Sequence, residues 1–226
     1  MTANVSKEST KIERRALRVS VRFNYVLFPL DLREFGRLLV ARGYDLPGEM
    51  PPDPAVGGPD VQHGGQGQLA RKGEFVIDVN TERQFFGVTG GDPQRTLAEL
   101  EGIAGDLKDS VDFNKAMFYE LQARYIVRPK KSPLALVQSW GREAAPVRSA
   151  SAAFGKPMNL FSVRLTSGIA GPNSPDYFEI WIQPAAASPN RDLGVSVVFR
   201  NSKLSEFREF AGSFESMTAK LLQSAQ

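Results

Sequence analysis

Arginine and aromatic residues recur on the polar side of segments in which apolar and polar residues alternate. In residues 17–27 every odd position is apolar, and Arg18 and Arg22 lie between these positions. A period of two is typical of a strand with one buried and one solvated face. Guanidinium and aromatic groups are enriched at interaction surfaces because they combine contact area with fixed hydrogen-bond donors. We therefore expect one sheet face to bind a partner, through polar-side residues of five predicted strands: Arg18, Arg22, Arg124, Arg164, Tyr177, Trp181 and Arg200.

Three interpretations of this predicted face are open. In the first, the face is solvated and its arginines pair with acidic residues on neighbouring strands. In the second, it is a protein interface, used for self-association or within a larger complex. In the third, it binds RNA or DNA, with arginines on phosphates and Trp181 or Tyr177 as a stacking platform. The acidic residues of the first interpretation are Glu74, Asp78, Glu120 and Glu179.

Basic residues outside the strands favour the nucleic-acid interpretation. The stretch RYIVRPKKSP adds a basic strand end and turn beside the predicted face, and the N-terminal segment adds further arginines. The modest net charge of +3 and the lack of a ribonucleoprotein motif argue against this interpretation. The additional predicted nucleic-acid contacts are Arg14, Arg15, Arg128, Lys130 and Lys131.

The residue types needed for most catalytic and metal-binding chemistry are scarce in this chain. It has no cysteine and one histidine, His63, in the stretch VQHGGQGQ. A His-Gly-Gly stretch can supply an oxyanion hole, but a lipase-like hydrolase also needs a Gly-x-Ser-x-Gly elbow and a second histidine for the triad. The sequence contains neither, so we predict no catalytic residues, no metal site and no cofactor. An enzyme that uses carboxylates and arginines on an anionic substrate is the third functional hypothesis, after protein binding and nucleic-acid binding.

Helix signals separate the predicted strands. Asp92 and Pro93 are typical of an N-cap and a first helical residue, and apolar residues follow at spacings of three and four. Gly43 follows a shorter apolar stripe and fits the left-handed residue that ends many helices. A long stripe at residues 204–221 predicts an amphipathic C-terminal helix, and a short helix is expected at 133–140.

Three more strands are predicted toward the C-terminus, at residues 159–167, 177–183 and 193–200. In the first of these, alternation places Phe161 and Leu165 on the side that faces the core. The stretch between the short helix and this strand has no clean period, so we expect it to be an irregular connector.

The order of these elements predicts an α+β fold, a mostly antiparallel sheet with amphipathic helices packed on one face. We expect a polar, basic N-terminal arm at residues 1–16 and a single domain at 17–226, with an irregular loop rich in proline and glycine at 44–68. The stretch VSVRFNYVLFPLDLREF has a faint echo in VSVVFRNSKLSEF, which suggests an internal duplication of a strand–helix unit, with halves at 17–128 and 158–226. The second and third predicted strands either extend the main sheet or form a separate ribbon.

Composition excludes several classes of protein. The 226 residues, 42% of them apolar and 23% charged, suffice for a substantial core in a soluble protein. The polar N-terminal residues do not resemble a signal peptide, and no stretch reaches the roughly 20 apolar residues of a membrane span. With the lack of cysteine, these features predict a cytoplasmic protein without membrane association. We predict a non-catalytic binding or assembly protein, either a homo-oligomer or a subunit of a complex, with nucleic-acid association as the alternative.

Overall fold

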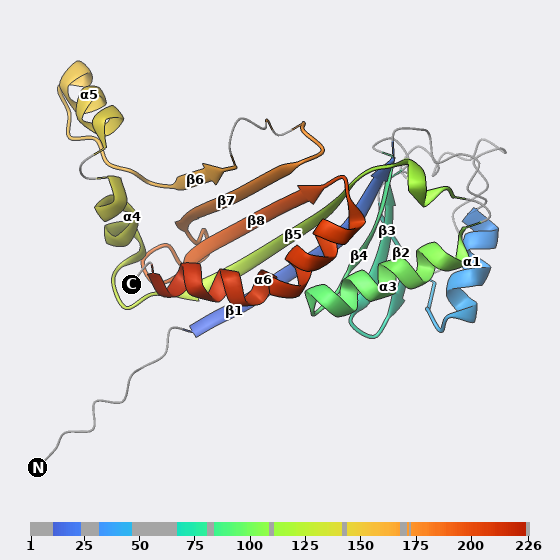
Figure 1. Ribbon diagram of the computed structural model, residues 1–226. Helices are drawn as coiled ribbons and strands as arrows, with labels where there is room; N and C mark the ends of the chain where they lie inside the picture. The colour runs from blue at the N-terminus through green and yellow to red at the C-terminus, as the bar shows by residue number, and fades with distance from the viewer. Residues whose placement is uncertain are drawn as a thin grey trace, which may run out of the picture.

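The computed structural model describes residues 11–23, 32–46, 67–80, 84–108, 111–141, 144–167, 171 and 173–224. Within these ranges eight strands form one antiparallel sheet in the order β2-β3-β4-β1-β5-β8-β7-β6 (Figure 1). The strands are β1 (Lys11–Phe23), β2 (Gly67–Lys72), β3 (Phe75–Asn80), β4 (Phe85–Thr89), β5 (Ala116–Arg128), β6 (Val163–Thr166), β7 (Tyr177–Pro184) and β8 (Leu193–Asn201). The α-helices are α1 (Leu32–Ala41), α3 (Pro93–Asp106), α4 (Pro133–Gly141), α5 (Ala145–Phe154) and α6 (Leu204–Ser224). The predicted α+β class is confirmed, and the second and third predicted strands, β3 and β4, extend the main sheet.

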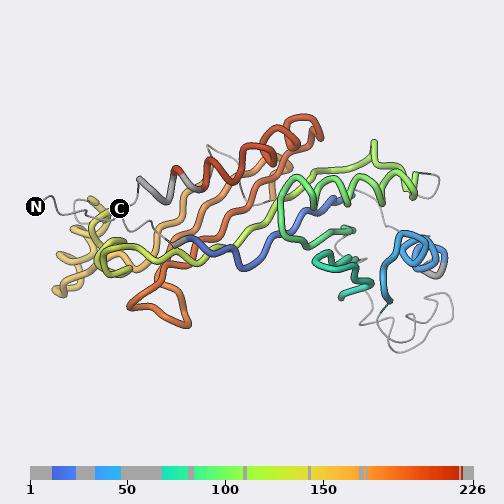
Figure 2. Tube along the Cα trace, turned by 90° about the horizontal axis from the view of Figure 1, so that it is seen from below, coloured from blue at the N-terminus to red at the C-terminus, as the bar shows by residue number. Residues whose placement is uncertain are grey.

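The sheet has a covered face and an open face. Helices α3 and α6 lie side by side over the covered face, and none of the described helices lies across the other (Figure 2). Alternate residues of the central strands, such as Val19 and Leu121, are fully buried on the covered face. The rings of Tyr119 and Tyr125 pack on α6, with centroids 5.8 and 6.2 Å from those of its aromatic residues Phe207 and Phe214. The residues between them along each strand point to the open face.

The strand order is symmetrical about the central pair, β1 and β5. In each half, a central strand is followed along the chain by a helical segment, three meandering strands and a long helix on the covered face. This order makes β1 correspond to β5, and β4 to β8. The two similar stretches of sequence lie in β1–α1 and β8–α6, so they occupy non-equivalent positions. Their similarity does not define the symmetry of the sheet, and an internal duplication stays a prediction.

Two elements contradict the expectation of irregular structure. Strand β2 begins at Gly67, inside the predicted loop, whose residues 47–66 lie outside the described part of the chain. A register shift between Gln68 and Ala70 makes two consecutive residues buried in β2, so the strand lacks simple alternation. Helix α5 lies within the stretch expected to be an irregular connector, and it buries none of its residues.

Two predicted boundaries also differ from the structure. Strand β1 begins at Lys11, within the predicted N-terminal arm. Ile12 is exposed and a register shift follows Arg14, so no regular alternation marks this end. Strand β6 is only four residues long, and Phe161 and Leu165, expected to face the core, are 60% and 51% exposed. The reason is that β6 is the outermost strand, away from the two long helices.

Local helix signals are confirmed where the structure describes them. The Asp92 carboxylate accepts a hydrogen bond from the Arg95 backbone N–H at 2.9 Å, and Pro93 is the first residue of α3. Gly43 has a φ of +81°, the left-handed conformation expected after α1. The short helix expected from Pro133 is α4. Capping chemistry therefore gave more reliable boundaries than alternation did near the sheet edges.

A buried carboxylate fastens the turn between β7 and β8 to the end of β5. Asp192 is 4% exposed, and it accepts hydrogen bonds from Arg128 Nε at 2.9 Å and from the Ser188 hydroxyl at 2.7 Å. These bonds outweigh the effect of burial and lower the pKa of Asp192 from 3.8 to about 2. Ionised Asp192 therefore stabilises the folded state above about pH 4, and this contribution is lost as the pH falls toward about 2.

Asp192→Asn should lower the free energy of unfolding by about 1–3 kcal/mol at neutral pH, because the variant loses a charged acceptor in a buried network. The measurement is urea unfolding of the unmodified protein and the variant at several pH values between about 7 and about 2.5. The difference between their free energies of unfolding should shrink as the pH falls. Glu209→Gln on the exposed side of α6 is the control and should change the free energy by less than about 0.5 kcal/mol. A difference that does not depend on pH would contradict this role of Asp192.

Candidate functional site

Strand register aligns the residues of the open face in rows that cross the sheet. All seven predicted face residues lie in these rows, and two pairs of them, Arg200 with Tyr177 and Arg164 with Trp181, are directly opposite on neighbouring strands. The first row contains Phe85, Arg22 and Phe118. The second contains Asp78, Gly87, Ser20, Glu120, Arg200 and Tyr177. The third contains Thr89, Arg18, Gln122, Val198, Glu179 and Thr166, and the fourth contains Arg124, Ser196, Trp181 and Arg164.

Arg18 reaches Asp78 across an intervening strand. Its Nη2 and Nε lie 2.5 and 3.2 Å from the two carboxylate oxygens of Asp78, although β4 separates β1 from β3. Gly87 of β4 permits this approach, because a Cβ atom there would lie 2.9 Å from Arg18 Nε. The guanidinium carbon also lies 4.3 Å from the ring centroid of Phe85. Burial raises the pKa of the Asp78 carboxyl, and the charge of Arg18 opposes this rise.

Arg200 pairs with Glu120 at the centre of the open face. The two side chains are 18% and 9% exposed, and the Glu120 carboxylate also accepts a hydrogen bond from Gln122 at 2.6 Å. The guanidinium carbon of Arg200 lies 4.8 Å from the ring centroid of Phe118 and 5.6 Å from that of Tyr177. Arg200 is therefore held in place by one carboxylate and two rings.

Glu179 accepts hydrogen bonds from two neighbouring side chains. Arg164 donates to its Oε2 from Nε at 2.8 Å and from Nη2 at 2.5 Å, and the Tyr177 hydroxyl donates to the same oxygen. Burial acts to raise the pKa of Glu179, but these hydrogen bonds outweigh it and the pKa is lowered. The bond to Glu179 and burial raise the pKa of Tyr177. Tyr177 is 5% exposed, so the expectation of an exposed stacking ring is wrong at this position.

Small residues at the centre of the rows leave a hollow of about 230 Å³ in the open face. Ser20 lies opposite Gly87, between the longer side chains of the neighbouring rows. Arg22 is exposed, lies 5.8 Å from the ring centroid of Phe118, and makes no ion pair with a residue that the structure describes. The hollow therefore offers one guanidinium without a carboxylate partner beside two that have one. Its lining consists of Arg18, Ser20, Arg22, Phe85, Phe118, Glu120, Gln122 and Arg200.

The fourth row contains the other exposed groups of the predicted face. Trp181 is 40% exposed and lies between Ser196 and Arg164. Arg124 is exposed at the other end of the row, and it too lacks an ion pair within the described residues. The cross-strand pairing of the first interpretation thus holds for three face arginines but leaves Arg22 and Arg124.

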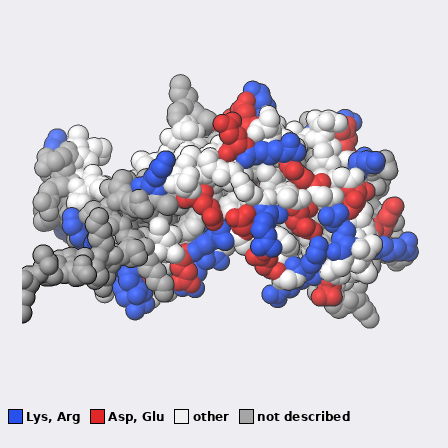
Figure 3. Space-filling model, turned by 60° about the horizontal axis from the view of Figure 1, so that its bottom comes forward, with Lys and Arg blue, Asp and Glu red and all other residues white. Residues whose placement is uncertain are grey.

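Three of the five additional predicted nucleic-acid contacts pair with acidic residues. Arg14 pairs with Glu215 of α6, on the covered side, Arg15 lies 3.1 Å from Glu13, and Arg128 pairs with Asp192. Acidic and basic side chains are interspersed on the side of the molecule that Figure 3 shows. Two of the predicted nucleic-acid contacts, Lys130 and Lys131, are exposed in the turn after β5.

The four acidic residues of the first interpretation, which are also the carboxylates of the enzyme hypothesis, each pair with a separate arginine. Glu74 lies 2.8 Å from Arg95, and the other three pair with the face arginines described above. Only Glu120 among them lines the hollow. Across the described ranges, no group of three or more acidic or histidine residues is placed to hold a metal ion. None of the helices described is both long and apolar enough to cross a membrane.

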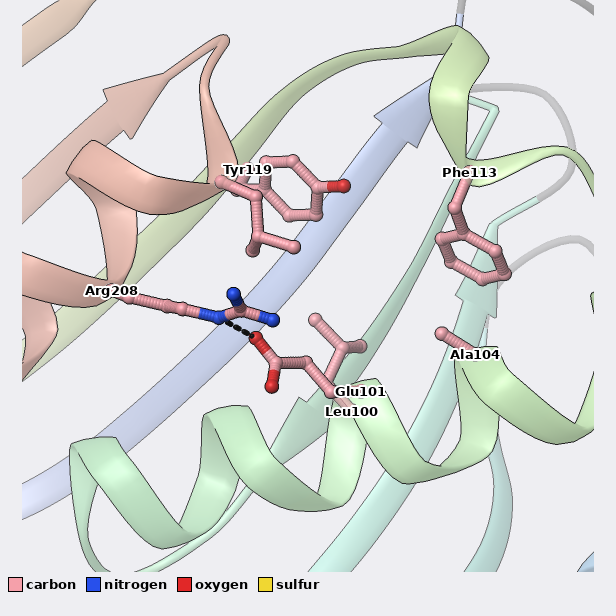
Figure 4. A pocket seen from close by; sticks show the side chains of 7 residues that line it. Leu100, Glu101, Ala104, Phe113, Tyr119 and Arg208 are labelled. Carbon is pink, nitrogen blue, oxygen red and sulfur yellow. Dashed lines mark hydrogen bonds and ion pairs between the residues drawn. The ribbon is translucent and has the colours of Figure 1, made fainter.

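A second hollow, of about 160 Å³, lies on the covered side between α3 and α6 (Figure 4). Its charged groups are Glu101 and Arg208, whose Oε1 and Nε lie 2.7 Å apart across the two helices. The rest of its lining is mainly apolar and includes Leu100, Ala104 and Leu204. The ion pair of Glu101 and Arg208 links the two helices across this hollow and neutralises its charges.

Comparison with known proteins adds no assignment to this geometry. No protein-family model matches the chain, and no curated protein matches it in sequence.

Sequence patterns did not identify the residues that shape the hollow, above all Ser20, Gly87, Phe85 and Phe118. One available signal was Gly87 itself, because a glycine inside a strand is typical of a close approach by another group.

Gly87→Ala should lower the free energy of unfolding by about 1–3 kcal/mol, because its Cβ displaces the guanidinium and leaves Asp78 partly buried without its cation. Urea unfolding should show a smaller cost of Gly87→Ala in a protein that already carries Arg18→Ala, with a remainder from Ser20 Cβ, which would lie 3.0 Å from the added carbon. Gly194→Ala in β8 is the matched control, since the nearest atoms to its Cβ lie 3.8 Å away. An equal cost with and without Arg18 would show that the approach of Arg18 does not explain this glycine.

Proposed function

We propose that this chain is a non-catalytic binding subunit that holds an acidic segment of a partner protein on its open sheet face. The observation that carries the proposal is Arg22, a guanidinium that lines the hollow and has no carboxylate partner among the described residues. Guanidinium groups bind carboxylates through two parallel hydrogen bonds. Gln122 adds hydrogen-bonding groups and the partly exposed Phe85 adds apolar contact area, whereas Ser20 and Phe118, 4% and 3% exposed, form the floor of the hollow.

The neighbouring arginines support this proposal because they are fixed before a partner arrives. Arg18 is held by Asp78 and the ring of Phe85, and Arg200 is held by Glu120. Side chains that are already ordered lose little conformational entropy on binding. Because these side chains are already in place, the surface favours a partner whose shape and charge fit the hollow as it stands.

The carboxylates of the face favour an isolated acidic side chain over a phosphate backbone. Phosphate chains bind best where several cations are free, because each contact releases a counterion. Here Asp78, Glu120 and Glu179 already neutralise three of the arginines. Nucleic acid is the second candidate, and the observation in its favour is the fourth row, where exposed Trp181 shares a row with unpaired Arg124.

Arg22→Glu should raise the Kd for a fluorescently labelled, glutamate-rich peptide by about tenfold or more, because the variant replaces the attracting charge with a repelling one. Fluorescence anisotropy at fixed ionic strength is the measurement. Arg37→Glu on the exposed side of α1 makes the same change of net charge away from the open face, and should alter the Kd by less than about twofold.

A labelled single-stranded RNA of similar net charge separates the two candidates. Binding to the peptide that is tighter than binding to the RNA, and sensitive to Arg22→Glu, agrees with the proposal. Tighter binding to the RNA that weakens steeply with salt and depends on Arg124 and Trp181 would favour nucleic acid instead. Equal effects of Arg22→Glu and Arg37→Glu would remove the hollow as the binding site.

A further inference from the structure

The two edges of the sheet differ in how their backbone groups are protected. At β2, Asp45 and Arg71 exchange backbone hydrogen bonds of 2.7 and 2.8 Å, and a register shift interrupts the strand. At β6, no described strand pairs with the outer edge, and the ladder to β7 has no register shift. An edge strand that is neither bulged nor covered can pair with another chain, and on a short strand such as β6 a charged side chain limits the registers that are allowed. The edge at β6 is therefore the one suited to pairing.

The directions of the β6 backbone groups follow from its ladder with β7. Ser167 N–H donates to the Phe178 carbonyl at 2.9 Å, so the backbone of Ser167 points toward β7. Successive residues of an antiparallel strand alternate in this direction. Leu165 therefore also points its backbone toward β7, whereas the N–H and C=O groups of Arg164 and Thr166 point to the open edge.

Antiparallel pairing of β6 with a second β6 has one favourable register. A register centred on Arg164 places two like charges directly opposite each other, which is destabilising. A register centred on Thr166 places Arg164 opposite a residue beyond β6. A register centred on Leu165 pairs Arg164 with Thr166 of the second copy, so that all the outward groups of both strands form hydrogen bonds.

Charge and apolar exposure fit the register centred on Leu165. Thr166 lies opposite Glu179 on β7, so Arg164 of the second copy enters the same cross-strand row as Glu179. A carboxylate has sites for several donors, and Glu179 can accept from both copies. Leu165, 51% exposed, would lie against Leu165 of the second copy on the covered side. In this register, pairing of two edges would combine backbone hydrogen bonds, an apolar contact between the two leucines and a row of ion pairs.

We infer that two copies of this chain pair antiparallel through β6, with a twofold axis at Leu165, to form one continuous sheet. This self-association uses the sheet edge and is independent of the acidic partner proposed for the hollow. The occupant is a second copy because the edge is complementary to itself in hydrogen bonding, charge and apolar contact.

Light scattering coupled to size-exclusion chromatography, over a wide range of protein concentration, tests the pairing. The unmodified chain should form a dimer. Thr166→Pro removes an outward N–H that takes no part in the ladder with β7, and it should raise the dimer dissociation constant by about tenfold or more. Circular dichroism and thermal unfolding should show that the variant monomer keeps its fold.

A charge-swap experiment tests the position of the axis. Leu165→Lys and Leu165→Glu should each be monomeric, since each places like charges across the axis, and a mixture of the two should restore a dimer. Leu134→Lys, at a similarly exposed leucine of α4, should leave the dimer intact. A monomeric unmodified chain, or a dimer that survives Thr166→Pro and both Leu165 variants, would overturn the inference. Two monomeric Leu165 variants that do not associate when mixed would overturn the register.

Discussion

The antiparallel ladder between β1 and β5 is the interaction on which the rest of the structure depends. These two strands join the two halves of the sheet. Their register places Val19 opposite Leu121 on the covered face and Ser20 opposite Glu120 on the open face. A slip of one residue would move the apolar side chains into solvent and the charges under the helices. Packing against α3 and α6 therefore fixes the positions of the polar rows as firmly as it fixes the core.

An open sheet face without covering helices must satisfy its charges across the strands. It does so with long arginine side chains that lie over small residues and aromatic rings, as Arg18 does over Gly87 and beside Phe85. Because these arginines are paired with acidic residues, they add little net charge to the open face. They contribute its shape and hydrogen-bond donors in fixed positions. Arg22 differs because its row supplies rings but no acid. In the proposed function, selective binding at the hollow would depend on this one cation among side chains that are already fixed.

Much of this fold was predictable because alternation and capping are local properties. The central strands with their polar sides and the start of α3 at Pro93 all follow from neighbouring residues in the sequence. Strand partners are not local, so alternation along one strand could not predict that Arg18 reaches over Gly87 to Asp78. It also could not predict that Tyr177 is buried by its neighbours. Helix α5 and strand β2 were missed for a related reason, since neither presents a regular buried stripe.

The face and the edge are compatible as interaction surfaces because they point in different directions. A twofold axis at Leu165 that keeps both leucines on the covered side runs across the plane of the sheet, so it places both open faces on the same side of the joined sheet. Each copy then contributes one hollow to a common surface. A partner with two acidic segments gains from this arrangement, because binding of the first segment raises the effective concentration of the second. The proposed pairing at β6 would thereby turn a hollow of modest charge into a bivalent surface for the proposed partner.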